Sequence, residues 1–191
     1  MRKIIATEFY TLDGMMSDPK DEMEWVLNIF SEDVGKYEDS IYDQVDTLIL
    51  GRVTFKIFEG HWPNIEENTT VDAGEKVLGK KINNAVKIVF SKTIKETTWN
   101  KSIIMEEINP GEISRMKNEK GKDMLIVGSS EIVRQFANLD LIDEYHLLLH
   151  PVILGNGKRL FNNTSAHKKL KLLNTKIFSN SVVGLFYGKE S

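Results

Sequence analysis

The sequence contains no cysteine, and this absence excludes several kinds of chemistry. The 191 residues can form no disulfide bond, zinc–thiolate site or iron–sulfur cluster, and they offer no cysteine nucleophile. Long apolar runs are also missing. Residues 147–149 are a typical run, whereas a membrane-spanning helix needs about 20 apolar residues. The N-terminal residues lack the apolar stretch and cleavage site of a signal peptide. We therefore expect a cytoplasmic protein without a membrane partner.

Charge of one sign is not in large excess. Lysine and arginine number 25 and aspartate and glutamate 28, which gives a net charge of −3. No broad basic field therefore recruits nucleic acid, and we expect no nucleic-acid partner. With 41% hydrophobic and 28% charged residues, the composition is that of a globular protein. A chain of this length fits one hydrophobic core, so we predict a single domain over residues 1–191.

Hydrophobic patterns predict alternating strands and helices up to residue 140. Strands are predicted at residues 3–9, 47–51, 87–90, 102–105 and 124–128. Helices are predicted at residues 25–43, 52–60, 73–82, 112–120 and 129–138. Beyond residue 140, strand-like segments follow without helices, at residues 143–151, 169–178 and 181–188. This order predicts an α/β fold with a mostly parallel sheet that antiparallel C-terminal strands extend.

Two glycines end predicted strands and are followed at once by predicted helices. These junctions begin at Gly51 and Gly128. Free backbone N–H groups and the helix dipole at such a junction favour a phosphate, and ligands bind beyond the carboxyl ends of parallel strands. Two junctions on one sheet indicate a ligand with two linked phosphates. Ordinary helix capping by small residues is the alternative.

A lysine follows the predicted strand at residues 87–90. Ser91 and Lys92 lie there, and the lysine either holds a terminal phosphate as a point charge or lies in a solvated turn. The chain has neither a GxGxxG nor a GxxxxGK[ST] motif, which argues against an ordinary Rossmann fold and against a P-loop.

Five segments, in this order, resemble those of dihydrofolate-reductase-like proteins. They are TLDGMMS at 11–17, LILGRVTF at 48–55, IVFSKT at 88–93, IVGSSEIV at 126–133 and DEYHLLLHPVILGNGKRLF at 143–161. The chain is most similar to stand-alone proteins that resemble the C-terminal reductase domain of the bifunctional riboflavin-biosynthesis deaminase/reductase. The resemblance spans nearly the whole chain. It implies a three-layer fold with a mixed sheet of about eight strands, NADPH as the hydride donor, and a homodimer formed through the C-terminal strands.

The resemblance also assigns cofactor-binding positions in this sequence. Asp13 lies in the loop that would border the nicotinamide. The positions implied to bind the cofactor are Leu12, Gly14, Trp25, Gly51, Arg52, Thr54, Ser91, Lys92, Gly128, Ser129, Ser130, Glu131, Ile132 and Val133.

The substrate half departs from the riboflavin reductases. They typically carry a DDPxLxxR segment after the position of Thr54, where this chain has FKIFEGHWPN, and a substrate-binding glutamate where this chain has Gly128. We therefore expect a retained cofactor half and a different substrate half. Trp62 either lines the substrate pocket or packs beneath its loop.

Folate reductases use an acid on the helix after the first loop, with an aromatic residue one turn later. Asp33 and Tyr37 have this spacing, so we predict that Asp33 is the proton donor, faces the cleft and has a raised pKa, with Tyr37 at the substrate. Adjacent Glu32 should point elsewhere. The alternative places Asp33 in the first helical turn for its favourable charge there.

Asp13 is the second candidate catalytic carboxylate, and its alternative role is an Asx-type turn. His146 and His150 share a strand face, but no acidic third ligand is evident, so we predict no metal site.

Taken together, these observations predict an NADPH-dependent reductase of a small pteridine- or pyrimidine-like heterocycle. Lys92 favours NADPH over NADH, because it would pair with the 2′-phosphate. The alternative is a non-catalytic nucleotide-binding or regulatory dimer that keeps the cofactor cleft. Binding of NADPH is common to both, and hydride transfer separates them.

Overall fold

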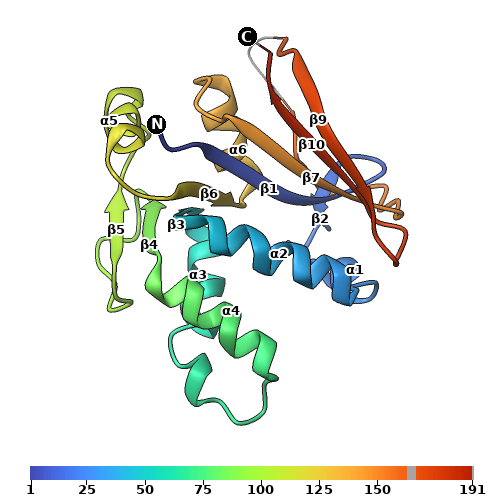
Figure 1. Cartoon of the computed structure of the whole chain (residues 1–191), viewed down its shortest axis with the longest axis horizontal. Helices are drawn as coiled ribbons and strands as arrows, with labels where there is room; N and C mark the ends of the chain where they lie inside the picture. Colours follow the sequence, from blue (N-terminus) through green and yellow to red (C-terminus); the bar gives the residue numbers. More distant parts are fainter. Residues whose placement is uncertain (163–166, 191) are drawn as a thin grey trace.

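The computed structural model describes residues 1–162 and 167–190, and its centre is an eight-stranded sheet. The strands lie in the order β5-β4-β3-β6-β1-β7-β10-β9 (Figure 1). Their bounds are β1 Ile4–Thr11, β3 Val45–Gly51, β4 Val86–Phe90, β5 Ser102–Met105, β6 Asp123–Val127, β7 Glu144–His150, β9 Leu170–Ile177 and β10 Val183–Lys189. The first six in this order are parallel, β10 is antiparallel to β7, and β9 is antiparallel to β10. The predicted mixed sheet is confirmed.

Helices cover both faces of the sheet. They are α1 Glu24–Leu27, α2 Glu32–Gln44, α3 Arg52–His61, α4 Ala73–Asn84, α5 Pro110–Asn118 and α6 Ser130–Asn138, with a short 3₁₀ helix, η1, at Ile65–Glu67. Two further strands, β2 Met15–Ser17 and β8 Lys158–Arg159, pair with each other. Among the described residues, no helix is long and apolar enough to cross a bilayer.

The alternation of side chains along the strands builds two hydrophobic cores. On β3, Leu48 and Leu50 face the core formed with α2, α3 and α4, whereas Ile49 faces the core formed with α5 and α6. The two faces of a strand alternate with each residue, so both faces of this strand are apolar, as expected for a parallel sheet buried on both sides. A third, smaller cluster joins Val34 of α2 to Phe178 beside the C-terminal strands.

The single helix predicted at residues 25–43 is wrong, because the chain forms two helices there. Helix α1 ends at Leu27, and α2 begins at Glu32 after Ser31, whose backbone is extended with φ −127° and ψ 155°. The sequence Ser-Glu-Asp at 31–33 is a helix-start signal, with an N-cap residue followed by acids in the first turn. The apolar residues keep a helical spacing on both sides of Ser31, so their pattern alone did not reveal the break between the two helices.

Charges at the amino ends of the strands form ion pairs. Lys3 at the start of β1 pairs with Glu144 at 2.6 Å, and Lys117 of α5 pairs with Asp143 at 2.6 Å. Arg2 pairs with Asp46 of β3. These three ion pairs balance charge at this edge, whereas the buried Lys87 of β4 has no acidic partner among the described residues and donates to Asn83 O at 3.0 Å.

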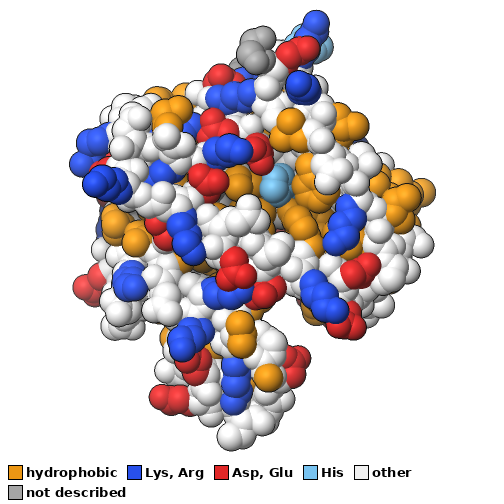
Figure 2. Space-filling view, viewed as in Figure 1, with side chains coloured by type: hydrophobic (Ala, Val, Ile, Leu, Met, Phe, Trp, Pro, Cys, Tyr) orange, Lys and Arg blue, Asp and Glu red, His pale blue; other side chains and the backbone are white. Residues whose placement is uncertain are grey.

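Exposed hydrophobic side chains are concentrated in two regions. Figure 2 shows charges of both signs interspersed over one face, with hydrophobic side chains gathered towards the side that the C-terminal strands and the first loop occupy in Figure 1. Strand β9 carries Leu172, Leu173 and Ile177, which are 50%, 51% and 78% exposed. It is the last strand of the sheet, so its outer edge has no neighbouring strand among the described residues.

Candidate functional site

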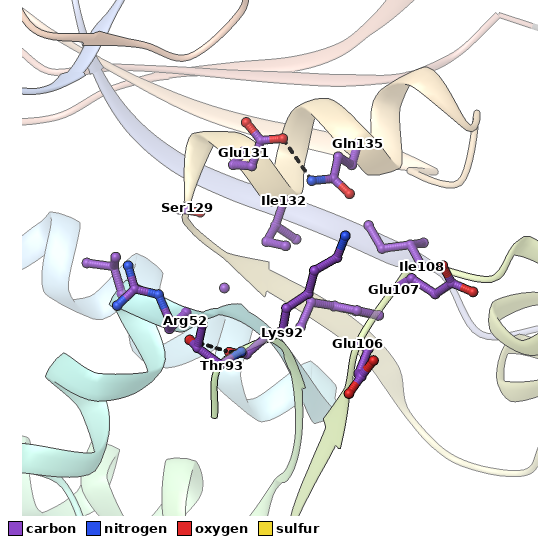
Figure 3. Close-up of a pocket in the computed structure, with 14 residues that line it drawn as sticks. Arg52, Lys92, Thr93, Glu106, Glu107, Ile108, Ser129, Glu131, Ile132 and Gln135 are labelled. Atoms are coloured by element: carbon purple, nitrogen blue, oxygen red, sulfur yellow. Dashed lines mark hydrogen bonds between the residues drawn. The ribbon is translucent and has the colours of Figure 1, made fainter. Parts of the chain in front are cut away.

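The carboxyl ends of β3, β4 and β6 meet at a cleft of about 430 Å³ (Figure 3). The sequence placed the junctions after these strands at one edge of the sheet, and the structure brings them together. The lining residues are Gly51, Arg52, Val53, Phe90, Ser91, Lys92, Thr93, Glu106, Glu107, Ile108, Ser129, Glu131, Ile132 and Gln135.

The junctions at Gly51 and Ser129 are in contact, which requires glycine at position 51. A Cβ atom on Gly51 would lie 2.8 Å from the Ser129 hydroxyl oxygen and 3.0 Å from Cγ1 of Ile132. Gly128 has φ +52°, a conformation that L side chains rarely adopt, and Thr54 lies beside it. These two glycines allow the helix starts of α3 and α6 to converge.

The two helices that begin at the cleft have no side-chain cap. Gly51 cannot cap α3, and Ser129 makes no capping hydrogen bond to α6. Asp72 caps α4, and Asn109 caps α5 by accepting from Gly111 N at 2.9 Å, whereas α1 and α2, like the cleft helices, have no side-chain cap. Backbone N–H groups in the first turn have no partner within their own helix. Those of α3 and α6 are therefore donors for an anion.

Two cations of the cleft form no ion pair with any described residue, and they are Arg52 and Lys92. Lys92 reaches across the cleft towards the space between α6 and the segment of Ile108 (Figure 3). Two of the cleft glutamates are engaged elsewhere: Glu106 pairs with Lys95 at 2.6 Å, and Glu131 pairs with Arg134. The cleft thus combines two cations outside any ion pair with free N–H groups, which suits phosphates, although Glu107 in the same lining also forms no ion pair with a described residue.

Ser91 supports the turn that carries Lys92. Its hydroxyl oxygen accepts from Ile94 N at 2.9 Å and from Thr93 N at 3.2 Å, and its side chain is buried. Ser91 lines the cleft, but its hydroxyl, which the resemblance assigned to the cofactor, already accepts two hydrogen bonds within this turn.

Several residues that the resemblance assigned to the cofactor lie away from this cleft. Val133 is the clearest correction: its side chain is fully buried in the core, and its N–H already donates to Ser129 O at 3.1 Å. Ser130 is also buried. Leu12 and Gly14 form the turn after β1, where Leu12 is exposed and Gly14 has φ +80°.

Trp25 is enclosed beside β7 and does not border the 430 Å³ cleft. Its ring packs edge-on against His150 with centroids 5.1 Å apart. The indole Nε1 and the His150 Nε2 are both buried without a hydrogen-bond partner among the described residues.

The raised pKa predicted for Asp33 is wrong. Its carboxylate accepts from Ser31 Oγ at 2.6 Å and from Ser179 N and Oγ at 2.8 and 2.9 Å. These donors stabilise the charged form and lower the pKa to about 2. Asp33 therefore ties α2 to the turn between β9 and β10. Glu32 pairs with Lys36 at the exposed surface and points elsewhere, as predicted.

Asp13 organises two loops. It accepts from the Thr11 hydroxyl at 2.5 Å and from Gly155 N at 2.7 Å, and these bonds lower its pKa. This geometry matches the turn role, which was the alternative for Asp13.

The two predicted substrate-binding aromatics are partly buried and pack against the hydrophobic cores. The Tyr37 hydroxyl is 2.8 Å from His146 Nδ1, and its ring contacts Phe178 and Phe186. Trp62 packs on Phe58, and its carbonyl accepts from Asn83 of α4 at 2.9 Å. Trp62 therefore follows the second alternative, packing beneath its loop. No group of His, Asp and Glu among the described residues could hold a metal ion.

Three titratable residues that the sequence reasoning missed lie near one another. Glu8 on β1 is 4% exposed, its Oε1 accepts from Gly128 N at 2.9 Å, and burial raises its pKa to about 8. Burial also raises the pKa of Glu38 to about 7. Burial likewise raises the pKa of Tyr42 above its usual value, and the charges of Glu38 and Glu8 add smaller contributions. Perturbed carboxyl groups without a cationic partner mark a candidate site.

A sequence signal for part of this group did exist. Glu38 and Tyr42 have the same acid–aromatic spacing, i and i+4, that selected Asp33 and Tyr37 one turn earlier. Glu8 gave a second signal, because a glutamate interrupts the otherwise apolar start of a strand that the sheet buries on both faces.

An eight-stranded, mostly parallel sheet with helices on both faces and an antiparallel C-terminal pair defines a dihydrofolate-reductase-like α/β protein. The family model described as the RibD C-terminal domain matches residues 2–183. The chain therefore belongs to the RibD C-terminal domain family and has its reductase-type fold.

One similar relative is the uncharacterized protein YyaP of Bacillus subtilis (strain 168). It is 35% identical over 186 residues, which cover 97% of this chain and 94% of the relative. A putative riboflavin biosynthesis protein from Shewanella sp. PV-4 has a similar crystal structure, with a TM-score of 0.76, 18% identity and 99% of each chain covered.

Two further solved structures share the fold. In the Thermotoga maritima deaminase/5-amino-6-(5-phosphoribosylamino)uracil reductase, the match covers 99% of this chain but 57% of that one, with a TM-score of 0.69 and 16% identity. Dihydrofolate reductase from Enterococcus faecalis, solved in complex with NADP(H), matches with a TM-score of 0.58, 12% identity and 99% and 97% of the chains covered.

Proposed function

We propose that this chain is an NADPH-dependent reductase of a small planar heterocycle of the pteridine or pyrimidine type. One observation carries the proposal: the uncapped starts of α3 and α6 face the same cleft as the unpaired Arg52 and Lys92. Two helix starts and two cations suit a ligand with linked phosphates. The dihydrofolate reductase that shares the fold binds NADP(H).

The residues present fit such a dinucleotide. The N–H groups at the starts of α3 and α6 would bind the pyrophosphate. Gly51 lets these two helix starts lie close together, because it has no side chain to meet Ser129 and Ile132. Lys92 would pair with the 2′-phosphate as a point charge. When bound, the nicotinamide supplies the hydride. Glu8, Glu38 and Tyr42 would line the substrate side, in place of the Asp33 predicted from spacing.

Titration of the cofactors tests this proposal. NADPH and NADH are each titrated against the chain by fluorescence, and NADPH is expected to bind more tightly. Oxidation of NADPH is then followed by absorbance with a panel of pteridines and pyrimidines. Binding with oxidation supports a reductase, whereas binding without oxidation of any member supports the non-catalytic alternative. If neither dinucleotide binds, the proposal fails.

We also propose that the chain forms a homodimer through β9. Within the part of the chain that the structure describes, its outer edge has no neighbouring strand, and three large apolar side chains of this strand are half exposed or more. Sedimentation measured over a range of concentrations should give a dimer, and Ile177→Lys should shift it towards monomer. The matched control is Ile57→Lys, a 61% exposed residue on α3. A monomer mass at every concentration contradicts this proposal.

A further inference from the structure

Glu8 is a buried carboxyl group at the junction between the cofactor cleft and the strand that crosses the molecule. It lies on β1 opposite the end of β6, and Gly128 N donates to its Oε1 at 2.9 Å. Gly128 immediately precedes Ser129, which lines the cleft. The neighbouring Gly128 and Thr54 are partly exposed, so the carboxyl group lies just beneath the surface at this edge.

No base neutralises Glu8. Among the described residues it forms no ion pair, and the groups that face it are acidic or neutral. The charges of Glu8 and Glu38 both act on the Tyr42 hydroxyl of α2, and Thr54 of α3 lies beside Gly128. On the adjacent β7, His146 is already bound by Tyr37 and Glu144. A carboxyl group in such surroundings keeps its proton at neutral pH, because burial disfavours its charged form.

The proton of Glu8 has a defined place. Because Oε1 accepts the Gly128 N–H, it acts as the carbonyl oxygen, and the proton resides on Oε2. Oε2 lies 3.8 Å from the position that a Cβ on Gly128 would take, and it has no hydrogen-bond partner among the described residues. It is therefore a hydrogen-bond donor available to a ligand.

We propose that Glu8 recognises the substrate as a neutral carboxylic acid, whose Oε2 donates a hydrogen bond to an unprotonated acceptor of the ligand, either a ring nitrogen or a carbonyl oxygen. The inference rests on the proposed reductase function and names the chemistry of its substrate. Such a site selects heterocycles with an acceptor at this position and disfavours those with an N–H or amino group there, since two donors would then face each other.

A probe that carries acceptors but no titratable N–H tests the inference. The probe is 1,3-dimethyllumazine, a fluorescent pteridinedione, titrated with and without NADP⁺ from pH 6 to pH 9.5. Binding should be constant at low pH and weaken above about pH 8, where Glu8 loses its proton. By pH 9.5 we expect a loss of at least tenfold.

Two substitutions separate the donor from the charge. Glu8→Gln keeps a donor and an acceptor, so the probe should bind at every pH with nearly the affinity that the native chain shows at pH 6. Glu8→Met removes the donor at similar volume and should weaken binding about three- to tenfold at all pH values. Glu32→Gln, at an exposed carboxylate of α2 that pairs with Lys36, is the control and should leave the fall above pH 8 in place.

A direct measurement makes the test independent of these variants. In the native chain labelled with ¹³C at its glutamate carboxyl groups, one carboxyl should titrate near pH 8 and shift when the probe is added. A flat pH profile, an unchanged profile in Glu8→Gln or no binding of the probe at any pH overturns the inference. NADPH binding measured on the same samples shows separately whether the proposed function has failed.

Discussion

The two edges of the central sheet differ in whether their charged side chains form ion pairs. At the amino ends of the strands, Arg2, Lys3 and Lys117 each have an acidic partner. At the carboxyl ends, Arg52 and Lys92 have no acidic partner among the described residues, and α3 and α6 begin without a side-chain cap. Unsatisfied groups reduce stability, so a fold retains them where a ligand satisfies them. The ion pairs of the amino edge therefore contribute to the stability of the fold, whereas the carboxyl edge leaves cations and N–H donors for the ligand proposed above.

Glu8→Gln gives the largest expected change in stability, and it should stabilise the protein. The pKa of Glu8 is raised to about 8, so between about pH 4.5 and 8 the folded state binds more protons than the unfolded state. The free energy of unfolding of the native chain should therefore fall with rising pH, by about 1.4 kcal/mol per pH unit from this group. The variant lacks this contribution.

Denaturant unfolding of the native chain and of Glu8→Gln at several pH values measures the difference. The gap in stability should widen in favour of the variant as the pH rises to 8. Glu32→Gln, an exposed carboxylate on α2, serves as the control and should show no such gap. A gap that stays constant from pH 5 to pH 8 would mean that Glu8 is ionised throughout.

Asp143→Asn tests the amino edge and should destabilise the chain. It leaves the Lys117 ammonium group, whose side chain is 8% exposed, without its partner. Breaking such a pair costs about 3 kcal/mol, the low end of the range because Asp143 itself is 24% exposed. Chemical denaturation measures the loss, and NADPH affinity of the folded variant should be unchanged. Weakened NADPH binding would break the proposed division between the two edges.

Lys92→Ala tests the carboxyl edge, where we expect a loss of binding and almost no loss of stability. Because Lys92 forms no ion pair with a described residue, its removal should leave the unfolding free energy within about 0.5 kcal/mol. NADPH affinity should fall about tenfold, while NADH affinity should stay the same. Lys95→Ala is the matched control, since that lysine already pairs with Glu106. Equal losses for both dinucleotides would remove Lys92 from the 2′-phosphate.

Asp33→Asn should produce the smallest effect and should concern the fold alone. The variant keeps an acceptor for Ser179 N but loses the charge that three donors stabilise. Because the pKa of Asp33 is lowered to about 2, its contribution is present above pH 4 and disappears as the pH falls towards 2. Thermal unfolding at pH 7 and pH 2.5 should show a modest destabilisation only at pH 7. A large change in NADPH oxidation would return Asp33 to the mechanism.

The sequence predicted the residues that meet at the cleft better than the titratable residues beside it, for a physical reason. Gly51, Lys92 and Ser129 follow directly from strand ends, and a parallel sheet brings such ends together whatever the side chains do. Position along the chain was therefore enough. For Asp33, the choice required knowledge of which donors surround the carboxylate, and Ser179 is 146 residues away in sequence.

The same limit explains why Glu8 was overlooked and why Val133 was assigned to the cofactor. The resemblance placed Val133 by its neighbours in the motif, but its helical position turns it into the core, where it is fully buried. Glu8 belongs to no motif that was recognised. Its importance depends on its burial and on the absence of a base, which are properties of the assembled fold.

The contact between Asp33 and Ser179 links the final hairpin to the helix that carries Glu38. Since α2 also holds α4 through Lys81 and Asp39 at 2.6 Å, this helix is a brace between the C-terminal strands and the rest of one face. The hairpin therefore supports the helix that carries Glu38, although none of its residues lines the cleft at Gly51 and Ser129. If the proposed function holds, variation in the last strands would alter the substrate side while these two junctions remain unchanged.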